Sequence, residues 1–274
     1  ILQALCEDIQ NYKFWLQLGL KNHPSIKMGL EMAILNLKNQ TPHVYFPSDF
    51  TLGKKAIEIN GLIWMGEYEG MRQQIIHKIN QGFTCVKLKI GAIDFAKEID
   101  LLRFIRANFD ERTIEIRVDA NGAFYENDAL NKINQITGFE IHSIEQPIEK
   151  NHTDTMSVLC KNSQIPIALD EELIGVFSAE DKKNLLQKIR PQYIVLKPSF
   201  VGGFRGTLEW ISIAEKLNIG WWITSALESN VGLNAIAQFT FMQNNLMPQG
   251  LGTGSLYTNN FDCPLEVFQG QLWY

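Results

Sequence analysis

Residues 114–121 have the sequence Ile-Glu-Ile-Arg-Val-Asp-Ala-Asn, an alternating apolar run that ends in a carboxylate. Two similar runs follow, one ending in Ile-Glu-Gln-Pro at residues 144–147 and one ending in Ala-Leu-Asp-Glu at residues 168–171. The acids that end the three runs are Asp119, Glu145 and Asp170. They lie 26 and 25 residues apart (145 − 119 and 170 − 145), so one chemical unit recurs at nearly constant spacing.

Lysines extend the same spacing on both sides of the acids. Lys89 precedes Asp119 by 30 residues (119 − 89), and Lys87 belongs to the same run. Lys197 follows Asp170 by 27 residues (197 − 170). The repeat therefore carries carboxylates in its middle units and lysines in the units that flank them.

The composition of the 274-residue chain is that of a globular protein long enough for one large α/β barrel. Its formal net charge of −5 argues against a nucleic-acid partner, since nucleic-acid-binding domains usually carry a clustered excess of Lys and Arg. The cysteines show no CxxC spacing, which argues against a zinc site or a disulfide framework and favours a cytoplasmic location. No apolar stretch is long enough to span a bilayer. We expect a small-molecule carboxylate as the partner, with no membrane contact, and the sequence carries no signal for an oligomeric state.

From about residue 56 onward, short apolar runs alternate with amphipathic stretches, as in βα units around a parallel sheet. We expect strands at residues 58–64, 86–90, 114–120, 141–145, 167–170, 193–197, 220–225 and 249–252. Apolar residues at helical spacing lie between them, for example Phe95, Ile99 and Leu102 after Asp94, a predicted N-cap. Eight strands favour a closed α/β barrel.

Residues 1–55 lack this alternation. They contain a predicted helix at residues 26–37 and a connector at residues 41–49 with two prolines. The final segment, residues 255–274, has no helical period, and we expect it to return to the N-terminal part. The chain is therefore predicted to divide at about residues 55 and 254, with the barrel and its active site between them.

Side-chain parity predicts that the acids face the inside of the barrel. Successive strand residues point to opposite faces of a sheet. In the run that ends at Asp119, one face carries Ile114, Ile116 and Val118 and the other carries Glu115, Arg117 and Asp119. Because a barrel ringed by helices needs an apolar outer face, the charged face must look inward. The acids and lysines also stand at or near the ends of their strands, where the loops of such barrels build active sites.

Asp119, Glu145 and Asp170 are the candidate metal ligands. Adjacent strands lie about 4.8 Å apart, so carboxylates that end three consecutive strands can converge on one cation. Oxygen ligands favour Mg²⁺, with Mn²⁺ as a possible substitute, over zinc, which prefers His or Cys. A single acid would more often cap a strand or pair with Arg117 or a lysine, but three consecutive inward acids favour the metal site.

Lys89 and Lys197 are the candidate catalytic residues. Their strands stand on opposite sides of an eight-stranded barrel, so a carboxylate substrate held by the cation would present its α-carbon to a lysine on each face. Burial beside Lys87 and a divalent cation disfavours the charged form of a lysine, which lowers its pKa toward that of a useful base. Lys87 and Lys89 could instead merely neutralise the acids, but the opposed Lys197 argues against this. The pattern indicates proton abstraction α to a carboxylate.

With this set of motifs, the chain resembles the enolase superfamily and, within it, the muconate-lactonising subgroup, whose known chemistry includes a Lys base with Mg²⁺. The motifs are Lys87-Leu88-Lys89, Asp119-Ala120-Asn121, Ile144-Glu145-Gln146-Pro147, Leu169-Asp170-Glu171 and Leu196-Lys197-Pro198. Residues 117–121 and 225–229 are most similar to the o-succinylbenzoate synthase family, and residues 23–33 look like the last helix of the superfamily's capping domain. The resemblance implies a (β/α)₇β TIM-like barrel with a partial N-terminal α+β capping domain.

The resemblance also implies an activity, that of a carbon–oxygen lyase. The reaction would be a Mg²⁺-dependent syn elimination of water from a succinyl-bearing cyclohexadiene carboxylate, a step of menaquinone biosynthesis. Lys89 would remove the α-proton and then protonate the leaving hydroxyl, and Lys197 would stabilise the enediolate from the opposite face. Supporting residues for the substrate or the metal would be Lys87, Arg117, Asn121, Ser225 and Gly252.

Several other functions share parts of this pattern. N-acylamino acid racemases and muconate cycloisomerases keep the lysines, and a racemase side activity is chemically reasonable because two opposed lysines can exchange a proton on either face. A dipeptide epimerase is less favoured, because the Asp-x-Asp expected on its eighth strand is replaced by Gly250-Leu251-Gly252.

The match of the glycines at residues 202–206 to a phosphate loop is weak. A binding barrel without catalytic activity conflicts with the intact lysines and acids. His142 has outward parity and is expected to be structural or solvated.

Overall fold

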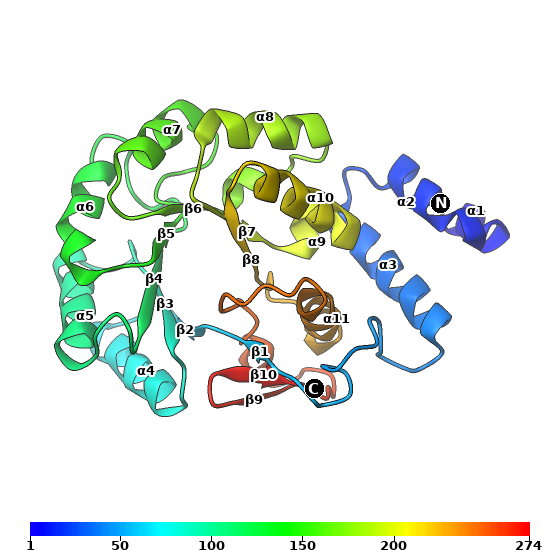
Figure 1. The fold of residues 1–274 in the computed structure, drawn as a ribbon, viewed down its shortest axis with the longest axis horizontal. Helices are drawn as coiled ribbons and strands as arrows, with labels where there is room; N and C mark the ends of the chain where they lie inside the picture. The colour runs from blue at the N-terminus through cyan, green and yellow to red at the C-terminus, as the bar shows by residue number, and fades with distance from the viewer.

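A curved parallel sheet of seven strands forms the centre of the molecule (Figure 1). The computed structural model describes residues 1–274, apart from the side chain of Ser255. Along the sheet, the strands are β2 Gly61–Ile63, β3 Cys85–Lys89, β4 Glu115–Asp119, β5 Ser143–Glu145, β6 Ile167–Leu169, β7 Tyr193–Leu196 and β8 Gly220–Ile223. Sheet order equals chain order, and each neighbouring pair is parallel, as consecutive βα units require.

Residues 249 and 250 take the place of an eighth strand. Gln249 bridges Ile59 and Gly250 bridges Thr224, both in the parallel sense, so this short segment joins the two edges of the sheet. The Gly250 N–H donates to the Ile223 carbonyl oxygen at 2.8 Å. The predicted TIM-like architecture is confirmed, but its eighth strand is shorter than the expected residues 249–252.

Helices cover the outer face of the sheet (Figure 1). They are α4 Tyr68–Asn80, α5 Phe95–Asn108, α6 Ala129–Ile136, α7 Thr153–Asn162, α8 Ala179–Ile189, α10 Gly203–Lys216 and α11 Asn230–Phe241. The short helix α9 Pro198–Val201 follows the end of β7. Short 3-10 turns lie at η2 Thr137–Phe139, η3 Glu171–Leu173 and η4 Gly254–Leu256. The predicted N-cap of α5 is confirmed, because the Asp94 carboxylate accepts the Ala96 N–H at 2.9 Å. Within the described part of the chain, no helix has the length and apolar content needed to cross a membrane.

The first 40 residues form a group of helices beside the barrel (Figure 1). They are α1 Leu2–Glu7, η1 Ile9–Asn11, α2 Tyr12–Gly19 and α3 Pro24–Asn39. Of these, α3 contacts α9 and α10. The N-terminal proline of α3 sits where a helix loses no hydrogen bond, in agreement with the predicted helix.

The C-terminal segment forms a hairpin of β9 Glu266–Phe268 and β10 Gln271–Trp273. It pairs with β1 Ile57–Glu58 in the order β1-β10-β9. The predicted strand at residues 58–64 is therefore divided between this small sheet and the barrel. The ring of Tyr274 lies 5.8 Å from that of Phe50, so the C-terminus packs beside the segment that leads into the barrel. The division of the chain into three parts stays a prediction.

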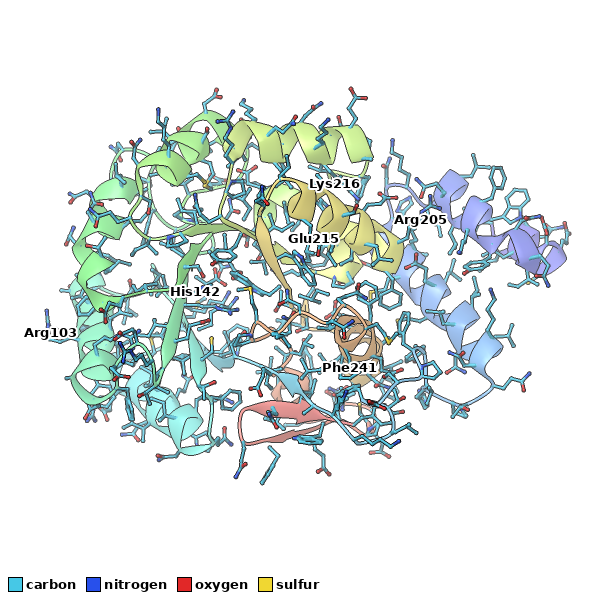
Figure 2. The ribbon with its side chains drawn as sticks, viewed as in Figure 1. Arg103, His142, Arg205, Glu215, Lys216 and Phe241 are labelled. Carbon is cyan, nitrogen blue, oxygen red and sulfur yellow. The ribbon has the colours of Figure 1, made fainter. Side chains whose placement is uncertain are left out.

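On β3 and β4, the charged side chains lie on the inward face, whereas the outward residues Val86, Leu88, Ile116 and Val118 are buried and apolar. Lys87 is the register partner of Arg117, and Lys89 is the partner of Asp119. His142 departs from its expected outward position: its ring lies 4.8 Å from that of Tyr193 and 6.3 Å from that of Trp222 (Figure 2). Because residue 142 precedes β5, strand alternation does not determine where its side chain points.

Glu98 of α5 holds the loop that follows β3. Its Oε1 accepts backbone N–H groups of Gly91, Ala92 and Ile93 at 2.7, 3.2 and 3.3 Å. Its Oε2 is buried without a hydrogen-bond partner. Burial raises the pKa of Glu98 above its ordinary value of 4.5, and the three N–H donors offset only part of that effect.

Glu98→Gln is expected to stabilise the protein relative to wild type near neutral pH, and the difference should disappear as the pH falls below about 4.5. The folded state binds the Glu98 proton more tightly than the unfolded state. Wild-type stability from this group is therefore fully present below the unfolded pKa and is lost as the pH rises through the folded pKa. Urea unfolding of both proteins across this range measures the difference. A difference that grew as the pH fell would contradict the assignment.

Candidate active site

A cavity of about 350 Å³ opens at the carboxyl ends of the barrel strands. Seven of the ten predicted site residues line it: Lys87, Lys89, Asn121, Glu145, Lys197, Ser225 and Gly252. Asp119 and Asp170 lie behind this lining, in contact with its lysines. Arg117 lies deeper in the barrel, beside Lys87. The structure thus gathers residues from strands that are distant in the sequence around one opening.

The three predicted ligand carboxylates are almost completely buried, with exposed fractions of 0% for Asp119, 1% for Glu145 and 2% for Asp170. Asp119 and Glu145 are register partners on β4 and β5, which places their side chains on one face at one level. Asp170 directly follows β6. Buried carboxylates are unfavourable unless cations or hydrogen bonds compensate them.

Lys87 and Lys89 supply that compensation for the first two acids. Lys87 Nζ donates to Asp119 Oδ2 at 3.0 Å and to the two oxygens of Glu145 at 3.1 and 2.9 Å. Lys89 Nζ donates to Asp119 Oδ2 and to Asn121 Oδ1, both at 2.6 Å. Lys87 is therefore fully engaged between two acids, whereas Lys89 reaches the cavity rim.

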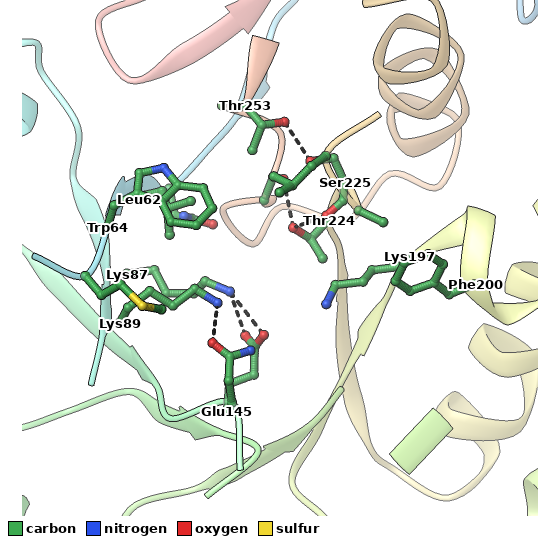
Figure 3. A pocket seen from close by; sticks show the side chains of 17 residues that line it. Leu62, Trp64, Lys87, Lys89, Glu145, Lys197, Phe200, Thr224, Ser225 and Thr253 are labelled. Atoms are coloured by element: carbon green, nitrogen blue, oxygen red, sulfur yellow. Dashed lines mark hydrogen bonds and ion pairs between the residues drawn. The ribbon is translucent and has the colours of Figure 1, made fainter. Parts of the chain in front are cut away.

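Lys197 approaches from the other side of the cavity, where its ammonium group pairs with Asp170. Figure 3 shows its side chain extending toward the ends of Lys87 and Lys89 across the opening. The side chains of Lys89 and Lys197 are only 13% and 18% exposed. A molecule in the cavity would therefore have one lysine on each side, as the strand count predicted.

The electrostatics of this cluster follow from burial and charge together. Burial raises the pKa of Glu145 to about 8, and the neighbouring charge of Asp119 adds to the effect. Burial alone would also raise the pKa of Asp119, but the charges of Lys87 and Lys89 hold it well below its usual range. Burial lowers lysine pKa values, yet the adjacent carboxylates outweigh it, so the pKa values of Lys87 and Lys197 are raised.

Carboxylate oxygens are the donors that a hard divalent cation prefers. As the side chains lie here, no three His, Cys, Asp or Glu groups among the described residues are close enough to hold a metal ion, and the Lys87 ammonium lies between two of the acids. Glu171, beside Asp170, has an Oε2 that is buried without a partner. Burial and the charge of Asp119 raise the pKa of Glu145, and burial and the charge of Asp170 raise that of Glu171. A divalent cation at these carboxyl groups would favour their ionised forms and would offset the charge of an anionic substrate.

Two residues that follow the acids adopt left-handed backbone conformations. Asn121 has φ +44° and Gln146 has φ +39°. The Asn121 side chain accepts from Lys89 and donates to Glu171 Oε1 at 3.0 Å. Gln146 Oε1 accepts the Asp170 N–H at 3.2 Å. Gln146 was not a predicted site residue, although its place directly after Glu145 was the available signal.

Arg117 supports the site from below. Its Nε donates to Glu115 Oε1 at 2.7 Å, its Nη1 donates to the Pro248 carbonyl oxygen at 2.8 Å, and its guanidinium lies 4.4 Å from the Trp222 ring. The side chain is 1% exposed and does not line the cavity. It thus links β4 to the segment that closes the barrel.

The remaining cavity wall is apolar on two sides and hydroxyl-rich on the third. Leu62 and Trp64 stand near Lys87 and Lys89, and Phe200 lies beside Lys197 (Figure 3). Ser225 Oγ and Thr253 Oγ1 form a hydrogen bond of 2.6 Å. The cavity therefore suits a small molecule with an apolar part and negatively charged or polar groups.

Comparison with known families agrees with this geometry. The family model described as "Enolase C-terminal domain-like" matches residues 70–273. This range contains each predicted catalytic lysine and each predicted ligand acid.

Similar proteins carry several activities. An o-succinylbenzoate synthase of Desulfotalea psychrophila is 53% identical over 249 residues, which are 91% of this chain and 67% of that protein. An L-Ala-D/L-Glu epimerase of Francisella tularensis subsp. novicida is 26% identical, over 87% of this chain and 67% of that protein. The crystal structure of MenC from Desulfotalea psychrophila superposes with a TM-score of 0.83 at 51% identity, over 88% of this chain and 67% of that chain. This chain therefore spans about two thirds of the length of these proteins.

Proposed function

This chain belongs to the enolase C-terminal domain-like family, and on that premise we propose that it acts as an o-succinylbenzoate synthase. The reaction is the dehydration of 2-succinyl-6-hydroxy-2,4-cyclohexadiene-1-carboxylate to o-succinylbenzoate in menaquinone biosynthesis. The observation that carries the proposal is the pair of nearly buried lysines, Lys89 and Lys197, on opposite sides of a cavity backed by three carboxylates. The 53% identity to a synthase supports this activity over others of the family.

Lys89 acts as the acid–base group. In its neutral form, Nζ takes the proton from the carbon next to the substrate carboxylate, which breaks the C–H bond and leaves an enediolate. The resulting ammonium then gives a proton to the hydroxyl on the neighbouring carbon, so the C–O bond breaks and water leaves as the ring becomes aromatic. One group serves both steps because the departing proton and hydroxyl lie on one face in a syn elimination.

Lys197 acts from the opposite face. Its ammonium group, held by Asp170, places a positive charge beside the electron-rich enediolate without accepting the proton. Asn121 orients Lys89 through its 2.6 Å hydrogen bond and is itself held by Glu171. Lys87 balances the charge of Asp119 and Glu145.

Members of this superfamily generally depend on a divalent metal ion. Asp119, Glu145 and Asp170 would hold Mg²⁺, or Mn²⁺ as a substitute, and the ion would supply positive charge to the substrate carboxylate as the α-proton leaves. The buried, mutually repelling carboxylates and the unpaired Glu171 oxygen support this assignment.

The direct test is an assay with the synthase substrate beside N-succinyl amino acids and a dipeptide. We expect rapid dehydration, and slow racemisation of an N-succinyl amino acid is chemically compatible because each lysine faces one side of the α-carbon. A protein that racemises N-succinyl amino acids but does not dehydrate the cyclohexadiene carboxylate would contradict the proposal. It would favour the N-acylamino acid racemase alternative.

Removal of divalent metal should abolish dehydration, and added Mg²⁺ should restore it. Without the cation, the positive charge that it would supply to the substrate carboxylate as the α-proton leaves would be missing. Activity after EDTA treatment and dialysis, with and without Mg²⁺, measures the effect. Thermal unfolding with and without Mg²⁺ gives a second readout, because an ion that binds only the folded protein raises its midpoint. Full activity in chelator would contradict the metal assignment.

A further inference from the structure

The cavity loop that follows β8 has a strained backbone and an unusual support. Leu227 lines the cavity and has φ +64°, a left-handed conformation that is unfavourable for a residue with a Cβ atom. Such a conformation persists only where surrounding contacts hold it. The neighbouring Ala226 also lines the cavity, so the shape of this wall depends on what fixes the loop.

Glu228 supplies the main support. Its Oε2 accepts the backbone N–H of Ala226 at 2.7 Å, which closes a tight turn around Leu227. The Tyr257 hydroxyl donates to the Leu227 carbonyl oxygen at 3.0 Å from the other side. At Gly232, an added Cβ would lie 2.8 Å from Glu228 Cβ, so glycine leaves the space in which the Glu228 side chain lies.

The same carboxylate reaches a second cavity wall. Glu228 Oε1 accepts the hydroxyl of Ser199 in α9. Lys197 caps this helix, because its carbonyl oxygen accepts the N–H of Phe200 at 2.8 Å and that of Val201 at 3.1 Å. Glu228 therefore connects the loop with the short segment that carries both Lys197 and the cavity residue Phe200.

The connection continues to the N-terminal helices. The Ser25 hydroxyl of α3 donates to the Ser199 carbonyl oxygen at 2.8 Å. Ser199 is 7% exposed, so water competes little for its hydroxyl. One carboxylate and one serine thus join three segments that are far apart in the sequence.

We propose that Glu228 is a positioning residue for dehydration. Through its contacts with the Ala226 N–H and the Ser199 hydroxyl, it holds the cavity wall at Leu227 in place relative to the segment that carries Lys197 and Phe200. The inference rests on the proposed function, since Lys197 is the group being positioned. Glu228 lines no part of the cavity and need not touch the substrate.

Kinetics of four variants test the proposal. Glu228→Ala should lower kcat/KM by about 100-fold and raise KM several-fold, because small displacements of catalytic groups are costly. Glu228→Gln should stay within about threefold of wild type, because its amide oxygen can accept the Ala226 N–H and its amino group can donate to Ser199 Oγ. Ser199→Ala should lower kcat/KM by about tenfold. The double variant with Ser199→Ala and Glu228→Ala should have a kcat/KM no lower than that of Glu228→Ala alone. Glu215→Ala on the exposed face of α10 is the matched control, with no expected change.

Hydrogen exchange provides a readout that does not depend on turnover. The Ala226 amide should exchange at least about tenfold faster in Glu228→Ala and in Ser199→Ala than in wild type, with Glu228→Gln protected. If Ser199 acted only within α9, its substitution would not change the exchange rate of the Ala226 amide. Unchanged exchange, or unchanged kinetics in an active Glu228→Ala protein, overturns the inference. A wild-type protein without dehydratase activity contradicts the proposed function instead. Hydrogen exchange at Ala226 then decides whether Glu228 and Ser199 hold the loop.

Discussion

Lys89→Ala should abolish dehydration, with kcat lower by about 10⁴-fold, because in the proposed mechanism this residue is both the base and the acid. The fold should remain intact, since Asp119 keeps its second lysine partner, Lys87, at 3.0 Å. Steady-state turnover of the purified variant in saturating Mg²⁺, with circular dichroism for the folded state, measures both expectations.

Lys89→Arg separates proton transfer from charge. Arginine keeps the positive charge but does not deprotonate near neutral pH, so this variant should be as inactive as Lys89→Ala. Lys183→Ala, which removes an exposed lysine from α8, should retain full activity. Turnover within about tenfold of wild type in Lys89→Ala would eliminate Lys89 as the base.

Lys197→Ala should also abolish measurable dehydration, with a loss of about 10³-fold in kcat, because it removes the positive charge that the proposed mechanism places opposite the base. The substitution leaves Asp170, which is 2% exposed, without its lysine. The variant should therefore be less stable than wild type without metal and should regain stability in Mg²⁺. Thermal unfolding in both conditions, beside steady-state kinetics in Mg²⁺, measures these effects.

Lys197→Arg should recover a substantial part of the activity, in contrast to Lys89→Arg, because the proposed role of Lys197 in dehydration requires charge and no proton transfer. Proton exchange on N-succinyl amino acids in D₂O gives an independent comparison. Loss of either lysine should slow exchange of one enantiomer far more than that of the other, since each lysine faces one side of the α-carbon. Equal recovery by arginine at both positions would contradict the division of roles.

Much of the fold could be predicted from local periodicity. Parity of the run that ends at Asp119 places its charged residues inside, and the structure has them there. The helix α11 was not predicted, because its residues from Leu233 to Thr240 are buried all round and so show no amphipathic period. The predicted eighth strand, residues 249–252, is longer than the observed one, because only residues 249 and 250 bridge the sheet edges.

The candidate site was predictable to the level of residue types and strand ends. The spacing of acids and lysines identified the side chains that gather around the cavity. It did not reveal that Lys87 lies between Asp119 and Glu145, nor that Gln146 holds the backbone at Asp170. These contacts join residues 24 to 58 positions apart, and strand periodicity contains no information on side-chain partners.

The sequence by itself determined the order of the βα units, the inward direction of the charged residues and the family chemistry that these residues support. The first two follow from the period of side chains along a strand or helix, which is a local property, and the third follows from the resemblance of the motifs to those of a known family. Only the tertiary structure decided how the walls of the cavity are held. The contacts of Glu228 with Ser199 and of Ser199 with Ser25 join segments 29 and 174 residues apart. They exist because the curved sheet and the packing of α3 against α9 bring those segments together, which no local pattern encodes.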